Sequence, residues 1–302
     1  MSAISHRFVA ANGLRFHVAM AGDPRAPLVV FLHGFPELWR AWRAQLVELG
    51  RDRFAIAPDQ RGYNLSDKPE GVAAYKVQRL VEDVAALAAT FTDRSFVLVG
   101  HDWGGAVAWN FAIAHPERLE KLVIVNAPHP VPFARMLAHD PAQQQASAYM
   151  NVFRGPGSER LLAADGCRRL TSTTLDVWAA DGEEQAAYLA AWSQPGALRA
   201  MLDWYRASPM HPPTADAPGA AKLALDAKDF IVRVPTLVIW GMRDQALLPC
   251  LLDGLEECVP DLRIERIEDG SHWVVHEQPE RVNALLRTFL DQRPGPFGGV
   301  GG

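Results

Sequence analysis

The sequence predicts an α/β protein with a mostly parallel central sheet, helices on both faces of the sheet and an inserted helical segment. Short, almost fully apolar runs have the composition of strands buried on both faces, at residues 28–32, 54–57, 96–99, 122–125 and 236–240. Helical patterns separate most of these runs, and strands that alternate with helices form a parallel sheet. About a hundred residues without a strand-like run precede the last of them, which predicts the insertion.

Composition limits the classes of function. A chain of 302 residues with 49% hydrophobic residues can bury a large core, and one catalytic domain with an insertion fits that length. The formal charge of -5 and the lack of a Lys/Arg-rich run exclude nucleic acid as the expected partner. The cysteines, Cys167, Cys250 and Cys258, have no metal-ligand spacing. We therefore expect reduced thiols and no metal site.

The N-terminal segment predicts a β-hairpin. Residues 8–19 alternate apolar and polar side chains around Asn12-Gly13, a pair that accepts the positive φ angles of a tight turn. The segment has no uninterrupted apolar core, so we expect neither a signal peptide nor a membrane anchor. A cytoplasmic location is the default expectation.

Three helices are predicted between the strands. The first covers residues 37–49 and ends at Gly50, the second covers residues 75–90, and the third covers residues 105–115 and ends before Pro116.

The alternation stops after Asn126, where Ala127-Pro128-His129-Pro130 begins the insertion. We predict a core of residues 1–127 and 231–293, a helical cap of residues 128–230 and a flexible tail of residues 294–302. The cap is rich in aromatic residues, namely Tyr149, Phe153, Trp178, Tyr188, Trp192, Trp204 and Tyr205. These side chains either enclose an apolar pocket at the carboxyl edge of the sheet or fill the core of the insertion itself.

The most informative segment is residues 97–105, Val-Leu-Val-Gly-His-Asp-Trp-Gly-Gly, which reads as a strand, a sharp turn and a helix. This is the form of a nucleophile elbow, in which the residue at the tip has a strained backbone and its neighbours two positions away must be small. Gly100 and Gly104 meet that requirement, and Asp102 occupies the tip. The N-terminus of the following helix favours its negative charge.

Other candidate residues follow strand ends in the order nucleophile, acid, histidine. Asp244 comes just after residues 236–240, and His272 lies in a Gly-Ser-His loop after a further strand. The backbone N–H groups of Phe35 and Trp103 are placed to converge on one oxygen. Each residue alone has a structural explanation, such as a helix cap or a packed histidine, but the four motifs together predict a catalytic set.

The motifs resemble those of the soluble epoxide hydrolases of the α/β-hydrolase superfamily, over nearly the whole chain. The matching residues are His33-Gly34-Phe35-Pro36-Glu37, Asp59-Gln60-Arg61-Gly62-Tyr63-Asn64-Leu65-Ser66-Asp67-Lys68-Pro69, Gly100-His101-Asp102-Trp103-Gly104-Gly105 and Gly270-Ser271-His272. The resemblance implies an α/β-hydrolase fold with a cap. It also implies that two cap tyrosines hold the epoxide oxygen, Tyr149 in a Tyr-x-x-x-Phe-x-x-Pro context and Tyr205 in a Trp-Tyr-Arg context.

This set predicts opening of an apolar epoxide without metal or cofactor. An ionised carboxylate attacks without help from a base, the tyrosines protonate the leaving oxygen, and His272, oriented by Asp244, activates the water that hydrolyses the ester. We expect substrate contacts from Phe35, Trp103, His33 and Pro36.

Two alternatives remain open. One is a haloalkane dehalogenase, which uses the same nucleophile and in which Trp103 would serve the halide. The other is a small-molecule binder of this fold without turnover. An esterase is disfavoured because no serine occupies the elbow.

Overall fold

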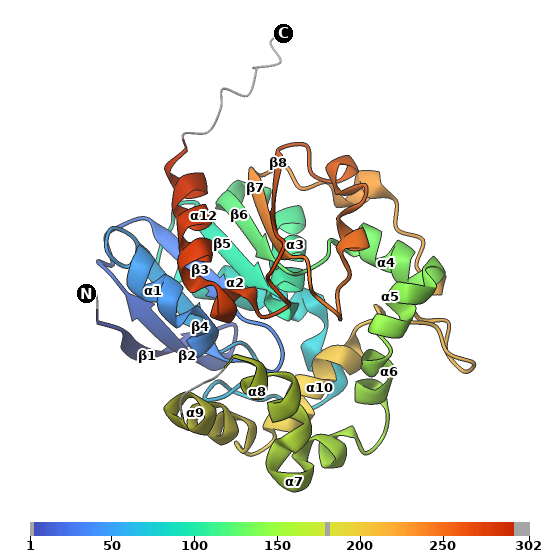
Figure 1. Ribbon diagram of the computed structural model, residues 1–302. Coiled ribbons are helices and arrows are strands. Elements are labelled where there is room, and N and C mark those ends of the chain that lie inside the picture. Colours follow the sequence, from blue (N-terminus) through green and yellow to red (C-terminus); the bar gives the residue numbers. More distant parts are fainter. Residues whose placement is uncertain (1–2, 179–181, 293–302) are drawn as a thin grey trace.

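The computed structural model describes residues 3–178 and 182–292, which form one eight-stranded sheet in the order β1-β2-β4-β3-β5-β6-β7-β8 (Figure 1). Among the described strands, β1–β2 and β2–β4 pair antiparallel and the other neighbours pair parallel. The predicted α/β-hydrolase architecture with a mostly parallel sheet is confirmed. The strands are β1 (Ser5–Ala11), β2 (Leu14–Ala21), β3 (Leu28–Leu32), β4 (Phe54–Pro58), β5 (Phe96–His101), β6 (Leu119–Val125), β7 (Thr236–Gly241) and β8 (Leu262–Ile267).

The N-terminal hairpin is confirmed. Its turn residues Asn12 and Gly13 have φ angles of 48° and 72°, and the strands pair from Ala11 opposite Leu14 outward. Strands β3, β4 and β5 are buried along their whole lengths, as apolar runs between two helical layers require.

Helices cover both faces of the sheet (Figure 1). The pair α1 (Arg43–Leu49) and α12 (Pro279–Asp291) packs on one face, and the pair α2 (Val77–Ala89) and α3 (Trp103–Ala114) on the other. The expected helix at residues 37–49 begins later, as the 3₁₀ turn Trp39–Trp42 that leads into α1, because the backbone of Leu38 is extended, with φ -150° and ψ -177°. The helix expected at residues 105–115 begins earlier, directly after Asp102.

The chain between β6 and β7 is helical and contains no strand in its described residues. Its helices are α4 (Pro130–His139), α5 (Pro141–Ala146), α6 (Tyr149–Arg154), α7 (Ser158–Thr173), α8 (Leu175–Trp178), α9 (Gly182–Trp192) and α10 (Ala197–Ala207). These helices lie where the cap is predicted. The division into core and cap remains a proposal, and the predicted tail lies outside the described residues.

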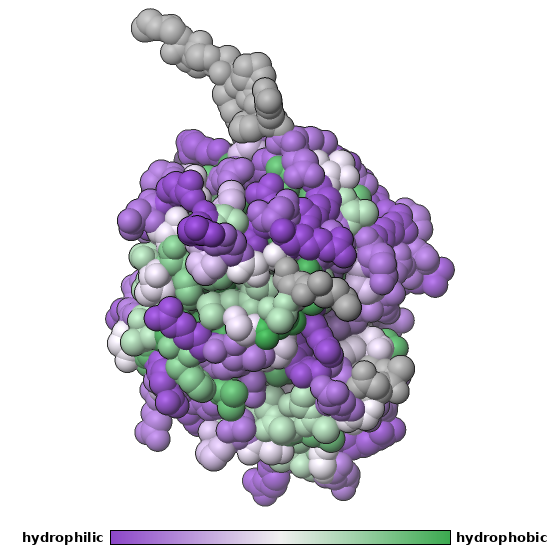
Figure 2. All heavy atoms as spheres, turned by 90° about the vertical axis from the view of Figure 1, so that its left-hand side faces the viewer, coloured by the Kyte–Doolittle hydropathy of each residue, from purple (hydrophilic) through white to green (hydrophobic). Residues whose placement is uncertain are grey.

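In the described ranges no helix is long and apolar enough to cross a bilayer. Figure 2 shows one face on which hydrophilic residues dominate the upper part and paler, more hydrophobic patches occur lower down. Cys167, Cys250 and Cys258 are free thiols.

Candidate active site

The turn between β5 and α3 holds Asp102 in a strained conformation, with φ 50° and ψ -121°. Positive φ is unfavourable for a residue with a Cβ, and such strain persists only where the surroundings enforce it. The flanking glycines provide the necessary room. A Cβ on Gly100 would lie 2.5 Å from the carbonyl oxygen of Gly104, and a Cβ on Gly104 would lie 2.2 Å from that of Leu32. The two small positions of the elbow are therefore required by backbone contact.

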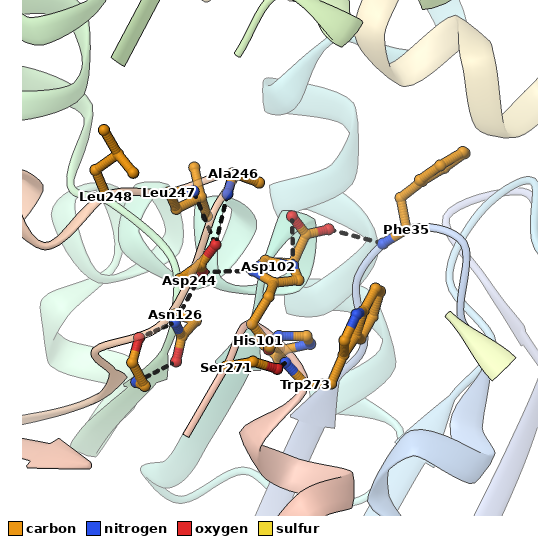
Figure 3. Close-up of polar contacts among 12 residues, drawn as sticks. Phe35, His101, Asp102, Asn126, Asp244, Ala246, Leu247, Leu248, Ser271 and Trp273 are labelled. Atoms are coloured by element: carbon orange, nitrogen blue, oxygen red, sulfur yellow. Dashed lines mark hydrogen bonds and ion pairs between the residues drawn. The ribbon is translucent and has the colours of Figure 1, made fainter. Parts of the chain in front are cut away.

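The two carboxylate oxygens of Asp102 have different neighbours (Figure 3). Oδ1 accepts a hydrogen bond of 2.7 Å from the backbone N–H of Phe35, whereas Oδ2 lies 3.7 Å from Nε2 of His272. The approach of Phe35 depends on Gly34, because a Cβ there would lie 2.4 Å from Oδ1. Trp103, the second predicted amide donor, is the first residue of α3. One oxygen is thus held by the backbone and the other faces the histidine.

His272 and Asp244 form the predicted pair. Nδ1 of His272 donates a hydrogen bond of 2.6 Å to Oδ2 of Asp244. Burial alone would lower the pKa of His272, but the charge of Asp244, the hydrogen bond to it and the charge of Asp102 raise the pKa to about 9. Burial likewise disfavours the ionised form of Asp244, yet the charge of His272 holds the pKa of this carboxyl below its usual value. Each residue therefore favours the charged form of the other.

Asp244 is held in place by three further donors (Figure 3). Its Oδ1 accepts hydrogen bonds of 2.9 Å from the N–H groups of Ala246 and Leu247, and its Oδ2 accepts one of 2.8 Å from Nδ2 of Asn126. Oδ1 of Asn126 in turn accepts from the N–H of Gly241 at 2.8 Å. Sequence reasoning missed Asn126. The available signal was a polar residue directly after β6, at the sheet edge where Asp102 and Asp244 also lie.

The two predicted tyrosines come from separate helices of the insertion and line one cavity with Asp102. Tyr149 begins α6, Tyr205 lies in α10, and their ring centres are 6.2 Å apart. Tyr205 packs edge-on against Trp103 at 5.1 Å and against Phe35 at 5.2 Å. Burial, followed by the charge of Asp102, raises the pKa of Tyr149, and burial together with the nearby Tyr149 raises that of Tyr205. Both hydroxyls therefore stay protonated and can donate.

A cavity of about 520 Å³ is lined by residues that follow the strands and by residues of the helical insertion. Its lining includes Asp102, Trp103, Tyr149 and Tyr205, and the other polar residues of the wall are Tyr75, Lys76, Gln78, Asn110 and Ser208. Most of the remaining wall is apolar and includes Pro128, Phe133, Met150, Trp204, Phe230 and Leu247. Some cap aromatics thus enclose a pocket, as one of the two interpretations predicts, and a mostly apolar small molecule fits the site.

Two predicted substrate contacts are not supported by the geometry. His33 is fully buried, with Nδ1 against the carbonyl oxygen of Gly34 at 2.9 Å and Nε2 accepting from the N–H of Gln60 at 3.1 Å. Pro36 is also buried, and its carbonyl oxygen accepts a hydrogen bond of 2.6 Å from the indole of Trp192. Like Phe35, His33 and Pro36 do not line the cavity. They support the loop that presents the Phe35 amide.

The described residues contain no group of three or more His, Cys, Asp or Glu side chains arranged to hold a metal ion. The groups that do converge are a carboxylate, a histidine–aspartate pair and two phenols. This set can attack an electrophilic carbon, protonate a leaving oxygen and activate a water molecule.

Comparisons with known proteins agree with the fold and with the resemblance to epoxide hydrolases. Residues 27–279 match the family model of the alpha/beta hydrolase fold. The chain is 40% identical to the AB hydrolase superfamily protein YfhM of Bacillus subtilis, over 96% of this chain and 99% of that protein. It is 33% identical to epoxide hydrolase 4 of Mus musculus, over 93% of this chain and 77% of that protein. The crystal structure of a Bacillus megaterium epoxide hydrolase in complex with an inhibitor superposes with a TM-score of 0.87 at 33% identity, covering 95% of this chain and all of that one.

Proposed function

The chain belongs to the epoxide hydrolases of the α/β-hydrolase superfamily, and on that basis we propose that it converts an epoxide to a vicinal diol through an ester on Asp102. The observation that carries the proposal is the position of the Asp102 carboxylate. It stands at the elbow, beside His272 and in a cavity that it shares with Tyr149 and Tyr205.

In the first step Oδ2 of Asp102 attacks one carbon of the oxirane. The bond between that carbon and the ring oxygen breaks, and an ester forms between Asp102 and the substrate. Because the oxygen leaves as an alkoxide, it needs a proton, which a tyrosine hydroxyl supplies. Tyr149 and Tyr205 line the same cavity as the nucleophile, which supports this role.

In the second step His272 takes a proton from a water molecule, and the water oxygen attacks Cγ of Asp102. The negative charge that develops on Oδ1 is stabilised by the Phe35 N–H, already bonded to that atom, and by the N–H of Trp103. When the tetrahedral intermediate collapses, the diol oxygen leaves with the proton from His272. The proton of the new Asp102 carboxyl group restores the tyrosine, so the net reaction adds one water molecule to the epoxide.

The charges of the site favour this order of events. In the free protein the pKa of His272 is raised to about 9, in part by the charge of Asp102. Formation of the ester removes that charge. The pKa of His272 then falls toward its ordinary value, and the neutral form needed to accept a proton from water becomes more populated.

Dehalogenation is the nearest alternative, since it shares the nucleophile and the ester hydrolysis. It differs at the leaving group, because a halide needs N–H donors and no acid. The indole of Trp103 could serve a halide, but many dehalogenases have an Asn after His-Gly, where this chain has Phe35. The two cavity tyrosines favour an epoxide.

The test is product analysis of the purified protein with styrene oxide and, separately, with 1-bromobutane. We expect diol from the first substrate, no bromide from the second, and no diol from the Asp102→Ala variant. Bromide without diol would make the protein a dehalogenase. Tight binding of a small molecule without turnover of any substrate would support the alternative of a non-catalytic small-molecule binder with this fold.

A further inference from the structure

One residue of the insertion, with no part in the proposed reaction, connects the helices of the two predicted acids. Arg154 is the last residue of α6, and Tyr149 is the first. Nη1 of Arg154 donates hydrogen bonds to the backbone carbonyl oxygens of Tyr205 and, at 2.5 Å, of Ser208. The carbonyl oxygen of Arg206 lies 3.4 Å from the same nitrogen. A side chain on the helix of one tyrosine therefore binds the backbone of the other tyrosine.

The Arg154 guanidinium is bound by carbonyl groups and not by a carboxylate. Burial lowers the pKa of this half-buried group, and no carboxylate in the described part of the chain lies close enough to raise it. The acceptors lie at the C-terminal end of α10, where backbone carbonyl groups have no intrahelical partner and carry a partial negative charge. A cation satisfies these groups. Arg154 thus caps α10 with a side chain that belongs to α6.

The position of α6 depends on its side-chain contacts. The helix has six residues, and isolated helices shorter than about 12 residues are marginal in water. Nδ2 of Asn151 donates a hydrogen bond of 3.1 Å to the carbonyl oxygen of Pro212, in the loop after α10. Arg154 instead reaches the last turn of α10 itself. Arg154 is therefore a direct hydrogen-bonded link between the two helices.

Helix α10 has an anchor of its own on the sheet domain. The indole Nε1 of Trp204 donates a hydrogen bond of 3.0 Å to the carbonyl oxygen of Arg61, in the loop after β4. Figure 1 shows α6 beside α10. Since α10 is fixed in this way, the contact from Arg154 sets where α6 and its Tyr149 lie relative to Tyr205.

We propose that Arg154 is a positioning residue for the first half-reaction: it holds α6 against α10 so that the hydroxyls of Tyr149 and Tyr205 meet the same leaving oxygen. This inference rests on the proposed function. The two rings are 6.2 Å apart between centres, and both line the cavity. An acid must lie within hydrogen-bond reach of the oxygen that it protonates, and a displacement of about 1 Å can lower a rate by about 100-fold.

The two half-reactions should depend differently on Arg154. Opening of the epoxide needs an acid at the leaving oxygen, so it needs Tyr149 in place. Hydrolysis of the ester uses His272, Asp244 and the N–H groups of the oxyanion site, and the hydrogen bonds of Arg154 reach none of these. A displaced α6 should therefore slow ester formation and leave ester loss unchanged.

The first variant is Arg154→Met, studied with an epoxide that the wild-type protein turns over. Rapid-quench sampling and mass spectrometry of the intact protein give the rates of ester formation and ester loss separately. We expect ester formation to slow by about 10- to 100-fold and ester loss to stay within about threefold. Equal slowing of both steps, or no change in ester formation, would overturn the proposal.

A matched control is Lys121→Met, which removes a helix cap of the same kind outside the proposed machinery. Nζ of Lys121 is buried at the C-terminal end of α12. It donates hydrogen bonds of 2.8, 3.0 and 2.6 Å to the carbonyl oxygens of Phe289, Leu290 and Gln292. We expect both rates in this variant to stay within about threefold of the wild type. Slow ester formation in both variants would mean that loss of any helix cap is sufficient, which contradicts a specific role of Arg154.

A double-mutant cycle separates positioning from a general loss of structure. If Arg154 acts by placing Tyr149, its loss has little further effect once the Tyr149 hydroxyl is absent. We expect Arg154→Met to slow ester formation by less than about threefold in the Tyr149→Phe background. The same factor in the presence and absence of the hydroxyl would refute the positioning role.

Arg154→Lys keeps the charge but replaces the planar fork of donors with a compact ammonium group. It should recover part of the rate of ester formation that Arg154→Met loses. If Arg154→Met does not fold, Arg154→Lys should still slow ester formation by about 3- to 10-fold with ester loss unchanged. Wild-type rates in Arg154→Lys, together with an unfolded Arg154→Met, would show that the cation only stabilises the fold and would overturn the proposal. Wild-type protein that forms no ester with any epoxide would instead refute the proposed function, so the two failures are distinguishable.

Discussion

Raising the pH should destabilise the protein through His272. The pKa of this residue is about 9 in the folded protein and 6.5 for the unperturbed side chain. A raised pKa means that the folded state holds the proton more tightly than the unfolded chain does. The resulting stabilisation is therefore complete below pH 6.5 and is lost as the pH rises through about 9. Since each pKa unit corresponds to about 1.4 kcal/mol, the loss is about 3 kcal/mol.

The assay is urea unfolding of the wild type and of His272→Gln at pH 6 and pH 10. Other groups also titrate in this interval, but they are common to both proteins. The difference between the two proteins therefore isolates the contribution of His272. We expect the wild type to lose about 3 kcal/mol more of its free energy of unfolding than the variant does. The same loss in both proteins would show that Asp244 and Asp102 do not raise the pKa of His272.

Four substitutions probe three separate parts of the site. Tyr149→Phe and Tyr205→Phe should each slow ester formation, and the double variant should slow it by about 10²- to 10⁴-fold because the leaving oxygen then has no acid. Rapid-quench measurement of the rate of ester formation checks this. An unchanged rate in the double variant would exclude the tyrosines as proton donors. Asn126→Ala should slow ester loss by about 10- to 100-fold and leave the rate of ester formation unchanged, because it removes a 2.8 Å hydrogen bond to Asp244. Equal effects on the two rates would contradict a role of Asn126 in holding Asp244. Gly34→Ala places a Cβ 2.4 Å from Oδ1 of Asp102 and should slow ester formation by about 100-fold or more in the same measurement. A variant that forms the ester as fast as the wild type would show that the hydrogen bond from the Phe35 N–H to Asp102 is dispensable.

The parts of the fold that depend on local sequence were predictable. Apolar runs located the strands because a strand between two helical layers must be apolar on both sides, and Asn12-Gly13 located the hairpin turn. Asp102 could be placed at the elbow because Gly100 and Gly104 are required by close backbone contacts, and such contacts leave a pattern in the sequence.

The parts that depend on contacts between distant segments were not predictable. Asn126 meets Asp244 only because β6 and β7 are neighbours in the sheet, and the pairing of Glu37 with His101 joins residues 64 positions apart. His33 was expected in the pocket because it belongs to a motif, but its ring turns inward to bond Gln60. A motif fixes which residues occur together, whereas the packing decides which side chains reach the cavity.

The most direct test of the Asp102 nucleophile is a single turnover in ¹⁸O-labelled water, with enzyme in excess over the epoxide. Water that attacks Cγ of Asp102 leaves its oxygen in the carboxylate, and both oxygens of the first diol then come from the epoxide and from unlabelled Asp102. We expect ¹⁸O in the peptide that contains Asp102 and none in the diol. A first-turnover diol carrying ¹⁸O, with an unlabelled Asp102, would mean that water attacks the epoxide directly and that no ester forms.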